Sequence, residues 1–382
     1  MKILLVIDQF GDANNGTTIS AMRFADMLKQ HGHDVRVVST GEEEEGKYVV
    51  REWHVPFFDR IIKEQGMAFA RPDRVLLEEA IRNVDVVHFL MPFALSMEGR
   101  KIAERLGVPH TAAFHVQPEN ITYTIGMGKW TGLNTAIYRG FRDLFYNHFR
   151  HIHCPSNFIA GELKKNGYTA ELHVISNGID GDFVYRKAEK SPELAGKFVI
   201  LNIGRFSNEK RQDILIEAAV RSKYADRIQL VFAGQGPNQK KYEQLSEKLP
   251  HAPIMRFFAK AGLMDMMAMS DLYVHAADAE IEAISCMEAF ASGLVPVIAN
   301  SPKSATPQFA LDERSLFAAG DSDDLARKID YWLEHEDERR EMEKRYAEHG
   351  RQYSLDHCVR QIEEMFLQEI REKEGERQYA AH

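Results

Sequence analysis

The sequence is short of cysteine, of long apolar runs and of net positive charge. Its 382 residues include three cysteines that are far apart, Cys154, Cys286 and Cys358, so we expect no disulfide framework and a reducing compartment. The opening run MKILLVID gives way to a polar loop, and it is therefore too short for a signal-peptide core or a membrane span. The formal net charge of -9 disfavours general nucleic-acid binding. We therefore expect a cytoplasmic protein that does not bind nucleic acid.

The composition is that of a folded protein with two globular domains. Hydrophobic residues make up 44% and charged residues 27%, and 382 residues exceed the usual size of one domain. Short apolar runs alternate with longer amphipathic stretches, which is typical of βαβ units with a parallel sheet. The strands predicted in the first half are Lys2–Ile7, Asp34–Thr40, Asp85–Leu90, His110–His115, His151–Ser156 and Glu171–Ser176. Those predicted in the second half are Phe198–Gly204, Ile228–Gly234, Ile254–Phe258, Leu272–Ala277 and Leu294–Ala299.

The two sets of strands are separated by Asn177–Lys197, whose glycines, proline and charges show no clear period and indicate a linker. We predict an α/β fold with one doubly wound, Rossmann-like domain over residues 1–189 and another over 190–360. Residues 361–382 are predicted to form a C-terminal helix that docks towards the first domain. Its apolar face consists of Ile362, Met365, Phe366 and Ile370. Ligands of such domains bind at the carboxyl ends of the strands, so we expect the site in the cleft between the domains.

The turn after the first predicted strand is a candidate phosphate-binding loop. It runs from Asp8 to Thr18 before a helical pattern, so its N–H groups could receive an anion at a helix N-terminus. Its glycines lack the G-x-G-x-x-G spacing, and a nicotinamide-binding fold therefore loses its main support. Gly16 in this loop also fits an ordinary turn.

A cluster of cations follows the predicted strand Phe198–Gly204. Arg205, Lys210 and Arg211 would lie at the carboxyl end of that strand, where they could neutralise a diphosphate. The alternative is a solvated basic turn, because charged residues at strand ends are common.

Two glutamates flank the start of a helix that is predicted to begin around Ala283 and to end with a left-handed cap at Gly293. Glu280 would lie in the loop before this helix and Glu288 on the helix itself. The free amides of the helix N-terminus would add positive potential beside them. For Glu282, a solvated loop carboxylate is the better interpretation.

Taken in order, these motifs resemble the retaining glycosyltransferases of family 4, which have the GT-B fold of two Rossmann-like domains. Glu280 and Glu288 match the E-x7-E element of that family, and the resemblance covers nearly the whole chain. The other matching pieces are the Gly16 loop, His115 after a strand, Ser176-Asn177-Gly178-Ile179-Asp180, Gly204-Arg205 with Lys210, and Ala233-Gly234-Gln235-Gly236-Pro237. Each piece alone is weak, but six in sequence are specific. The chain is similar in this respect to bacterial glycolipid and polysaccharide glycosyltransferases.

The resemblance implies a role for each matching residue. Arg205 and Lys210 would bind the donor diphosphate, Glu288 the ribose hydroxyls, and Glu280 the transferred sugar near its anomeric carbon. His115 would contact the donor sugar from the first domain. The other positions implied to bind the donor are Gly16, Ala283 and Ile284.

The implied reaction moves a hexose from a nucleotide diphosphate sugar, UDP-glucose by default, to a hydroxyl acceptor with retention of configuration. Attack on the same face as the leaving group would let the leaving phosphate take the acceptor proton, so no protein nucleophile is required. The nucleotide sugar is a co-substrate, and no cofactor is implied.

Two segments depart from the family pattern. Many members carry an aromatic residue and a glycine where this chain has Glu282 and Ala283. Many also carry Gly-Gly after Ala299, where this chain has Asn300-Ser301-Pro302-Lys303-Ser304. Both segments would border the donor sugar, so they leave the identity of that sugar open.

No essential metal is expected. His148, His151 and His153 are clustered, but they straddle a helix end and a strand start and have no carboxylate or cysteine ligands nearby in the sequence. Asp180-Gly181-Asp182 and Asp321-Ser322-Asp323 have the spacing of a metal-binding DxD motif, which also arises in loops and helix caps. Members of the resembling family usually neutralise the diphosphate with side chains and a helix dipole.

Two stretches mix aromatic residues with cations and could lie on an anionic membrane, Lys129–His153 and Val55–Lys63. Aromatic residues at this spacing also occur on core-facing helices. Related enzymes with such surfaces glucosylate lipids, so the expected acceptor is a membrane lipid such as diacylglycerol at the inner face of the cell membrane. Gln117, Glu119 and Asn120 follow a strand and could orient an acceptor hydroxyl or cap the next helix.

Three other functions stay open at this stage: a transferase for a soluble or capsular polysaccharide acceptor, a non-catalytic nucleotide-sugar-binding protein, and a nucleotide-sugar epimerase of similar fold. The presence of all five matching polar residues weakens the non-catalytic alternative. An epimerase would interconvert sugars without any acceptor.

Overall fold

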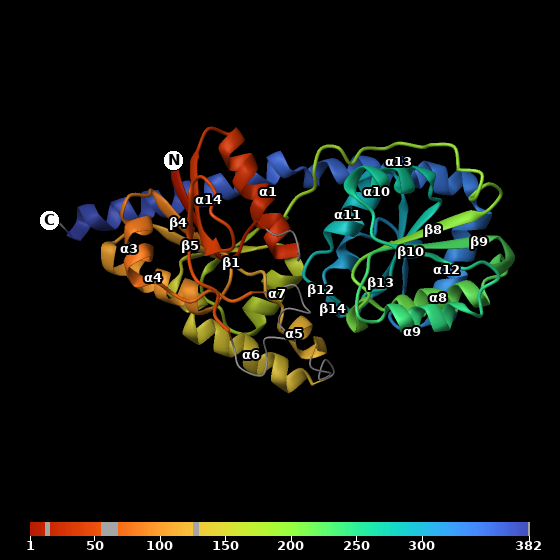
Figure 1. The fold of residues 1–382 in the computed structure, drawn as a ribbon, viewed down its shortest axis with the longest axis horizontal. Coiled ribbons are helices and arrows are strands. Elements are labelled where there is room, and N and C mark those ends of the chain that lie inside the picture. Colours follow the sequence, from red (N-terminus) through yellow and green to blue (C-terminus); the bar gives the residue numbers. More distant parts are fainter. Residues whose placement is uncertain (12–15, 55–67, 125–129, 381–382) are drawn as a thin grey trace. The chain divides into compact units, whose positions relative to one another are not determined.

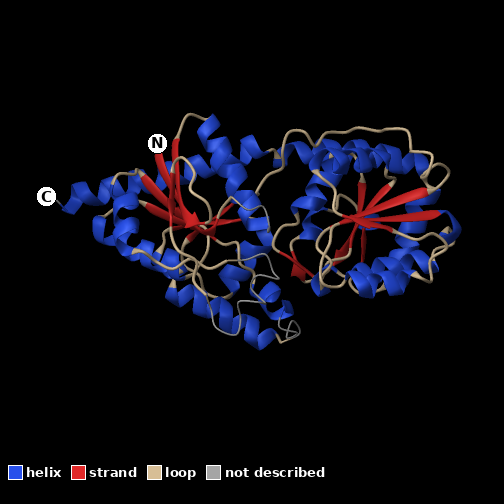
Figure 2. Ribbon diagram, in the orientation of Figure 1, coloured by secondary structure: helices blue, strands red, loops and turns tan. Residues whose placement is uncertain are grey.

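The protein is described here by a computed structural model that covers residues 1–11, 16–54, 68–124 and 130–380. The chain forms two compact units, each an α/β structure with helices packed around a sheet (Figure 2). The first unit comprises Met1–Pro118, Trp130–Gly178 and Leu355–His382. The second unit comprises Glu119–Lys129 and Ile179–Ser354. The predicted α/β class and the two parallel sheets are confirmed.

The first unit contains a seven-stranded sheet with the order β3-β2-β1-β4-β5-β6-β7, in which all pairs are parallel. Residues 3–8 of β1 are all buried, as expected for a central strand that is covered on both faces. The strands are β1 (Lys2–Gln9), β2 (Asp34–Thr40), β3 (Lys47–Val49), β4 (Val86–Phe89), β5 (His110–Ala113), β6 (His151–Cys154) and β7 (Glu171–Val174). The helices are α1 (Gly16–Gln30), α3 (Arg74–Arg82), α4 (Ala94–Leu106), α6 (Thr131–Leu144) and α7 (Asn157–Lys165), whereas α5 (Pro118–Thr124) belongs to the second unit from Glu119 onwards.

The last helix, α14 (Leu355–Ala380), belongs to the first unit although it follows the second unit in sequence. It packs against α1, β5 and β6, and in Figure 1 it is the blue helix beside the red α1. Ile362, Met365 and Phe366 are buried, so the predicted apolar face does dock on the first unit. The helix begins at Leu355, ahead of the start expected at residue 361.

The second unit contains a six-stranded sheet with the order β10-β9-β8-β11-β13-β15 and a separate β12-β14 pair. Its strands are β8 (Phe198–Ile203), β9 (Ile228–Ala233), β10 (Ile254–Arg256), β11 (Leu272–His275), β12 (Ala279–Glu280), β13 (Val295–Asn300), β14 (Lys303–Ser304) and β15 (Leu316–Ala318). Its helices are α8 (Gln212–Arg221), α9 (Gln239–Ser246), α10 (Lys260–Met269), α11 (Ile284–Ala291), α12 (Ser322–Glu334) and α13 (Glu336–Gly350).

The chain leaves the first unit after Gly178 and returns to it at Leu355. Gly178 has a φ of 72°, and a Cβ atom there would lie 2.8 Å from the Cα atom of Leu355. Both the backbone conformation and the close contact therefore require glycine at this position. The Ile179 amide donates to the Tyr353 carbonyl at 2.8 Å. This division differs from the boundary expected after residue 189, because the loop that follows Ile179 packs with the second unit.

None of the helices in the part of the chain that the structure describes combines the length and the apolar character that a membrane span requires.

Candidate active site

The loop after β8 is held close to the loop after β9 by two glycines of the second unit. A Cβ atom at Gly234 would lie 2.0 Å from the Gly204 carbonyl oxygen, and one at Gly236 would lie 2.6 Å from the Phe206 carbonyl oxygen. The Phe206 amide donates to the Gln235 carbonyl at 3.1 Å. Any side chain at either glycine would separate the loops and displace the cationic segment that follows Gly204.

That segment delivers Lys210 to Glu280. The ammonium of Lys210, in a 3-10 turn after β8, donates to Glu280 Oε1 at the end of β12. His275 at the end of β11 brings its Nε2 atom to 3.2 Å from the same oxygen. Residues at or just after the carboxyl ends of β8, β11 and β12 therefore converge on one buried carboxylate, which is where parallel sheets place their sites.

The electrostatics of this group keep both partners charged. Burial raises the pKa of Glu280, but the Lys210 ammonium and His275 outweigh burial and lower that pKa to about 2. Burial lowers the pKa of Lys210, but the Glu280 carboxylate raises it by more, so the pKa is above its usual value. A buried, ionised carboxylate and an ammonium with spare donors therefore stand side by side at neutral pH.

Helix α11 begins beside this pair with a strained residue. Ala283, its N-cap, has φ 72° and ψ 67°, a left-handed conformation that alanine rarely adopts. Ser285 in the first turn donates to the Ile203 carbonyl at 3.5 Å, which fixes the start of α11 near the end of β8. Gly293 has a φ of 89° just after the helix, so the predicted left-handed cap is confirmed.

Glu288 lies on α11 and is 7% exposed. Burial raises the pKa of Tyr273 well above its usual value, and the carboxylates of Glu280 and Glu288 both add to this effect. Both glutamates of the E-x7-E element are therefore buried and near enough to Tyr273 to act on its pKa.

The other two cations are placed differently. Arg211 pairs with Asp213 and Asp278, at 3.2 Å and 3.1 Å, so it anchors the loop through ion pairs of its own. Arg205 is half-buried directly after Gly204, and its carbonyl oxygen accepts a hydrogen bond from the Gln212 side chain at 2.9 Å. The structure brings Lys210 to Glu280. The role of Arg205 as a diphosphate ligand stays a prediction.

One segment that departs from the family pattern, residues 300–304, pairs with the short strand that precedes the other, Glu282-Ala283. β12 is hydrogen-bonded to β14, which is built from Lys303 and Ser304, and the Ala305 amide donates to the Glu280 carbonyl at 2.9 Å. The expectation for Glu282 is wrong, because this residue is 1% exposed and not a solvated loop carboxylate. The tight turn between β12 and α11 turns its side chain inwards.

In the first unit, His115 follows β5 and is buried. Burial, together with the nearby ring of His153, lowers the pKa of His115 well below its usual value, so the imidazole is neutral. The two rings lie 5.3 Å apart, edge to face. A neutral imidazole can accept or donate a single hydrogen bond to a sugar hydroxyl.

The acceptor candidates surround the start of α5. Gln117 and Glu119 are buried, whereas Asn120 is exposed. Glu119 lies in the first turn of α5, where a carboxylate is favourable at the helix N-terminus, and its role towards an acceptor stays a prediction. Gly16 begins α1 and is exposed; most of the loop before it lies outside the described residues.

Two polar residues of interest were not anticipated. His275 contacts Glu280, and Asp8 is a buried carboxyl at the end of β1. Both follow apolar strand residues at a carboxyl end, which is the signal that could have drawn attention to them.

The two acidic motifs with DxD spacing make contacts with other protein groups. Asp180 and Asp182 both pair with Lys260 at 2.8 Å. Asp321 caps α12 by accepting from the amides of Asp323 and Asp324, both at 2.9 Å. These acidic pairs therefore serve as loop and cap residues.

The three histidines that are close together in the sequence make different contacts in the structure. His148 ends a short 3-10 turn, and His153 contacts the Ile175 carbonyl through Nε2 at 2.7 Å. Of these three histidines, His151 alone has a cluster of possible ligands around it among the residues that the structure describes.

The basic aromatic stretch is largely part of the core. Its buried aromatic residues are Tyr138, Phe145, Tyr146 and Phe149. Trp130 and Leu144, at the two ends of α6, are 63% and 64% exposed. The second stretch, Val55–Lys63, lies outside the described residues.

Two family models match the chain in tandem. The model described as "Glycosyltransferase Family 4" matches residues 14–183, and the one described as "Glycosyl transferases group 1" matches residues 185–352. The chain is 26% identical over 320 residues to the alpha-monoglucosyldiacylglycerol synthase of Streptococcus pneumoniae, a match that covers 78% of this chain and 71% of the relative. It is 28% identical over 329 residues to a GDP-mannose-dependent alpha-mannosyltransferase of Corynebacterium glutamicum, covering 82% and 75%.

A solved structure shares the fold over nearly the whole chain. The Anabaena protein HepE, whose crystal structure contains UDP and glucose, superimposes with a TM-score of 0.73 over 96% of this chain and 100% of that chain, at 16% sequence identity. Two parallel-sheet units, a buried lysine–glutamate pair at the strand ends and the tandem matches define a glycosyltransferase of the GT-B fold. Within that class, the chain belongs to the family 4 glycosyltransferases.

Proposed function

We propose that this chain is a configuration-retaining hexosyltransferase that uses a nucleotide diphosphate sugar, with UDP-glucose as the first candidate. The observation that carries the proposal is the buried contact between Lys210 and Glu280 beside the start of α11. It places an ammonium suited to a phosphate next to an ionised carboxylate suited to a sugar ring. Glu288 lies on the same helix and would bind the ribose.

In the proposed reaction, the acceptor oxygen bonds to the anomeric carbon while the bond from that carbon to the β-phosphate oxygen breaks. The acceptor proton passes to the leaving phosphate, and the nucleoside diphosphate departs. Lys210 has three N–H donors, so it can hold Glu280 and neutralise the leaving phosphate at once. Glu280 would stabilise the positive charge that develops on the sugar. Arg205, Gly16, Ala283, Ile284 and His115 are proposed to complete the donor site.

The substitution Glu280→Gln tests this assignment. It should lower kcat by about 10²- to 10³-fold, because one preorganised electrostatic contact to the transition state is lost. UDP affinity should change little, since the diphosphate ligands remain. Glu247→Gln, at an exposed position of the same unit, is the control and should leave activity unchanged. Activity that survives Glu280→Gln, or a product with inverted anomeric configuration by NMR, would refute the proposal.

The donor can be identified by thermal shift. A ligand that binds only the folded state raises the apparent Tm in proportion to ln(1 + [L]/Kd), so UDP-glucose should raise it more than GDP-mannose at equal concentration. GDP-mannose is the competing candidate because the name of the Corynebacterium glutamicum relative specifies it. A shift with GDP-mannose alone would replace the proposed donor and leave the transferase assignment intact.

We propose a membrane lipid, of the diacylglycerol type, as acceptor, with the protein peripheral at the inner face of the membrane. The name of the Streptococcus pneumoniae relative supports this choice, as do the exposed Trp130 and Leu144 at the ends of α6 with the exposed Arg139 between them. Replacing Trp130 and Leu144 together by serine should weaken sedimentation with anionic liposomes at low salt. Val75→Ser, which removes an 80% exposed side chain elsewhere on the first unit, is the control. Parent protein that stays in the supernatant would favour a soluble or capsular polysaccharide acceptor.

We also propose that the donor diphosphate needs no divalent cation. Activity should persist in a chelator, because Lys210 and the N-terminus of α11 supply the positive potential. Activity lost in the chelator and restored by Mg²⁺ would contradict this.

A further inference from the structure

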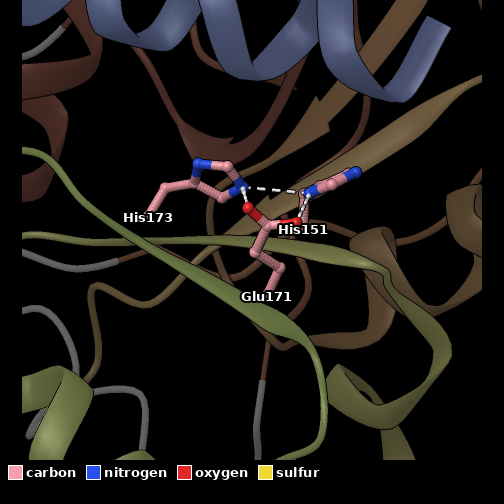
Figure 3. Close-up of side chains that lie close together, drawn as sticks. All are labelled: His151, Glu171 and His173. Carbon is pink, nitrogen blue, oxygen red and sulfur yellow. Dashed lines mark hydrogen bonds and ion pairs between the residues drawn. The ribbon is translucent and has the colours of Figure 1, made fainter. Parts of the chain in front are cut away.

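Two neighbouring strands of the first unit bring two histidines and a glutamate together. His151 opens β6 and is paired with Glu171, which opens β7, and His173 follows Glu171 by two residues. Because side chains alternate along a strand, Glu171 and His173 project from the same face of β7, next to His151. Figure 3 shows the two imidazole rings pointing towards each other with the Glu171 carboxylate beside them.

The atoms in this cluster have the spacing of metal ligands. His151 Nδ1 lies 2.9 Å from His173 Nε2 and 3.6 Å from Glu171 Oε2. His173 Nε2 lies 3.8 Å from Glu171 Oε1. Ligand atoms around a tetrahedral zinc ion lie about 3.3 Å apart, since each is about 2.0–2.2 Å from the metal. The three separations bracket that value, so small side-chain rotations would place all three ligands on one ion.

Helix α14 supplies the outer contacts that such a site requires. The other ring nitrogen of His151, Nε2, lies 3.1 Å from Glu372 Oε2 and 3.7 Å from Glu369 Oε2. A proton on Nε2 that is directed at these carboxylates leaves the Nδ1 lone pair free to face His173 and Glu171. A ligating histidine held by a carboxylate behind it is the usual arrangement of a protein zinc site.

Gln368 orients the glutamate ligand from the same helix. Its amide donates to Glu171 Oε2 and to Glu372 Oε1, both at 3.0 Å. Glu171 Oε1 therefore stays directed towards His173. One helix thus positions a ligand from each strand.

Charge and burial also suit a cation. The carboxylates of Glu171, Glu369 and Glu372 surround the two imidazoles, and the cations beside them are Arg150, at 3.9 Å from both Glu369 and Glu372, and Lys373 near Glu369. The Glu171 side chain is 56% exposed and gives an ion a path from solvent, while that of His151 is 1% exposed.

We propose that His151, His173 and Glu171 form a zinc-binding site, with water in the fourth position, that ties β6 and β7 to α14. Two imidazole nitrogens and one carboxylate oxygen are a ligand set that favours zinc over Mg²⁺ or Ca²⁺. The site belongs to the first unit, whereas Lys210 and Glu280 belong to the second. The proposal is independent of the transferase reaction.

The test uses the full chain, stripped with a chelator and dialysed into metal-free buffer at neutral pH. Calorimetric titration should show one equivalent of Zn²⁺ bound to the cluster, and Zn²⁺ should raise the Tm. Co²⁺ should give the visible absorption of a tetrahedral site. His173→Gln and Glu171→Gln should each weaken Zn²⁺ binding at least about 10-fold and abolish the Co²⁺ signal, because each removes one of three ligands. Both side chains are at the edge strand and partly exposed, so these variants keep the core intact.

Two further variants separate this site from other histidines. His357→Gln, at an exposed position of α14, should bind Zn²⁺ as the parent does. Glu372→Gln should weaken binding by about 10- to 100-fold without changing the stoichiometry, as expected for an outer contact. A parent protein that binds no Zn²⁺, or whose binding survives both His173→Gln and Glu171→Gln, would overturn the proposal.

Discussion

Ala283 carries backbone strain at the start of α11. Its left-handed φ of 72° disfavours any residue with a Cβ atom, and glycine would adopt it without that penalty. Ala283→Gly should raise the free energy of unfolding by about 1 kcal/mol in urea titrations, because the relief of strain exceeds the entropy cost of glycine. Ala289→Gly, the same change in the middle of the helix, should lower it by about 1 kcal/mol or more. Equal losses in both variants would show that Ala283 is unstrained.

Asp8 couples the stability of the first unit to pH. Its Oδ1 atom accepts from the Ala70 amide at 2.9 Å, while Oδ2 has no hydrogen-bond partner among the described residues. Burial raises the pKa of Asp8 to about 7, above the value of about 4 in an unfolded chain. The contribution of the protonated carboxyl is therefore complete below about pH 4 and is lost as pH rises through about 7.

Asp8→Asn should remove this dependence, because the amide keeps the Ala70 contact and stays neutral. We expect the variant to be more stable than the parent at pH 8 and to have a flatter Tm profile between pH 5 and pH 8. Asp26→Asn, at an exposed position of α1, is the control and should track the parent. Parallel profiles for Asp8→Asn and the parent would show that Asp8 is ionised at low cost.

Single residues were predictable where a chemical type recurs at a fixed spacing. Lys210 and Glu280 could be paired in advance because both follow apolar strands, and parallel strands end at the same edge. The burial of Glu282 could not be predicted, since it depends on a turn between a two-residue strand and a helix. His151 was considered with the wrong partners, because neighbours in the sequence are not neighbours across a sheet. Strand register, which pairs it with Glu171, is set by tertiary packing.

At the scale of elements, two histidines just after α1 hold α14 against the rest of the first unit. His31 Nδ1 and His33 Nε2 lie 2.7 Å and 2.8 Å from Glu363 Oε1, and His31 Nε2 lies 2.9 Å from Asp356 Oδ1. Burial lowers the pKa of His31, but Glu363 and Asp356 outweigh it, so the pKa is raised. The stability that this contact provides is fully present below about pH 6.5 and is lost as pH rises through the raised pKa.

Glu363→Gln should therefore cost about 1–2 kcal/mol at pH 6 and much less at pH 8.5, measured as the difference in free energy of unfolding from the parent. The contacts of His151 with Glu369 and Glu372 are the same in both proteins and cancel in this difference. Glu374→Gln, at an exposed position of α14, should cost little at either pH. A cost for Glu363→Gln that does not change with pH would mean that His31 stays neutral in the folded protein.

Most elements were predictable because the parallel sheet leaves a strong mark on the sequence. The predicted strands Asp34–Thr40 and Ile228–Gly234 match β2 and β9 to within one residue. β3, β12, β14 and β15 were missed, since strands of two or three residues leave no periodicity to detect. β12 and β14 exist because they pair with each other beside Glu280, which no local pattern encodes.

At the scale of the whole molecule, the first unit depends on a segment that is remote in sequence. Removing residues 355–382 would expose the surface that Ile362, Met365 and Phe366 cover. We expect the truncated chain to lose protease resistance in the first unit at a much lower temperature, while the 179–354 region keeps its own. Removal of 378–382 alone, whose described residues are exposed, is the control. Mass spectrometry of the fragments identifies which unit is cut, and equal resistance of both truncations would contradict the expectation.

The discontinuity of the first unit reverses the usual order of assembly during synthesis. A nascent chain normally completes its N-terminal domain first. Here the ribosome must finish Ile179–Ser354 before it reaches α14. The whole main segment of the second unit is therefore available to fold while the sheet that begins with β1 at Lys2 still lacks α14. During that interval the apolar surface destined for α14 is open to chaperones, and slowing translation after residue 354 should prolong their association with the nascent chain.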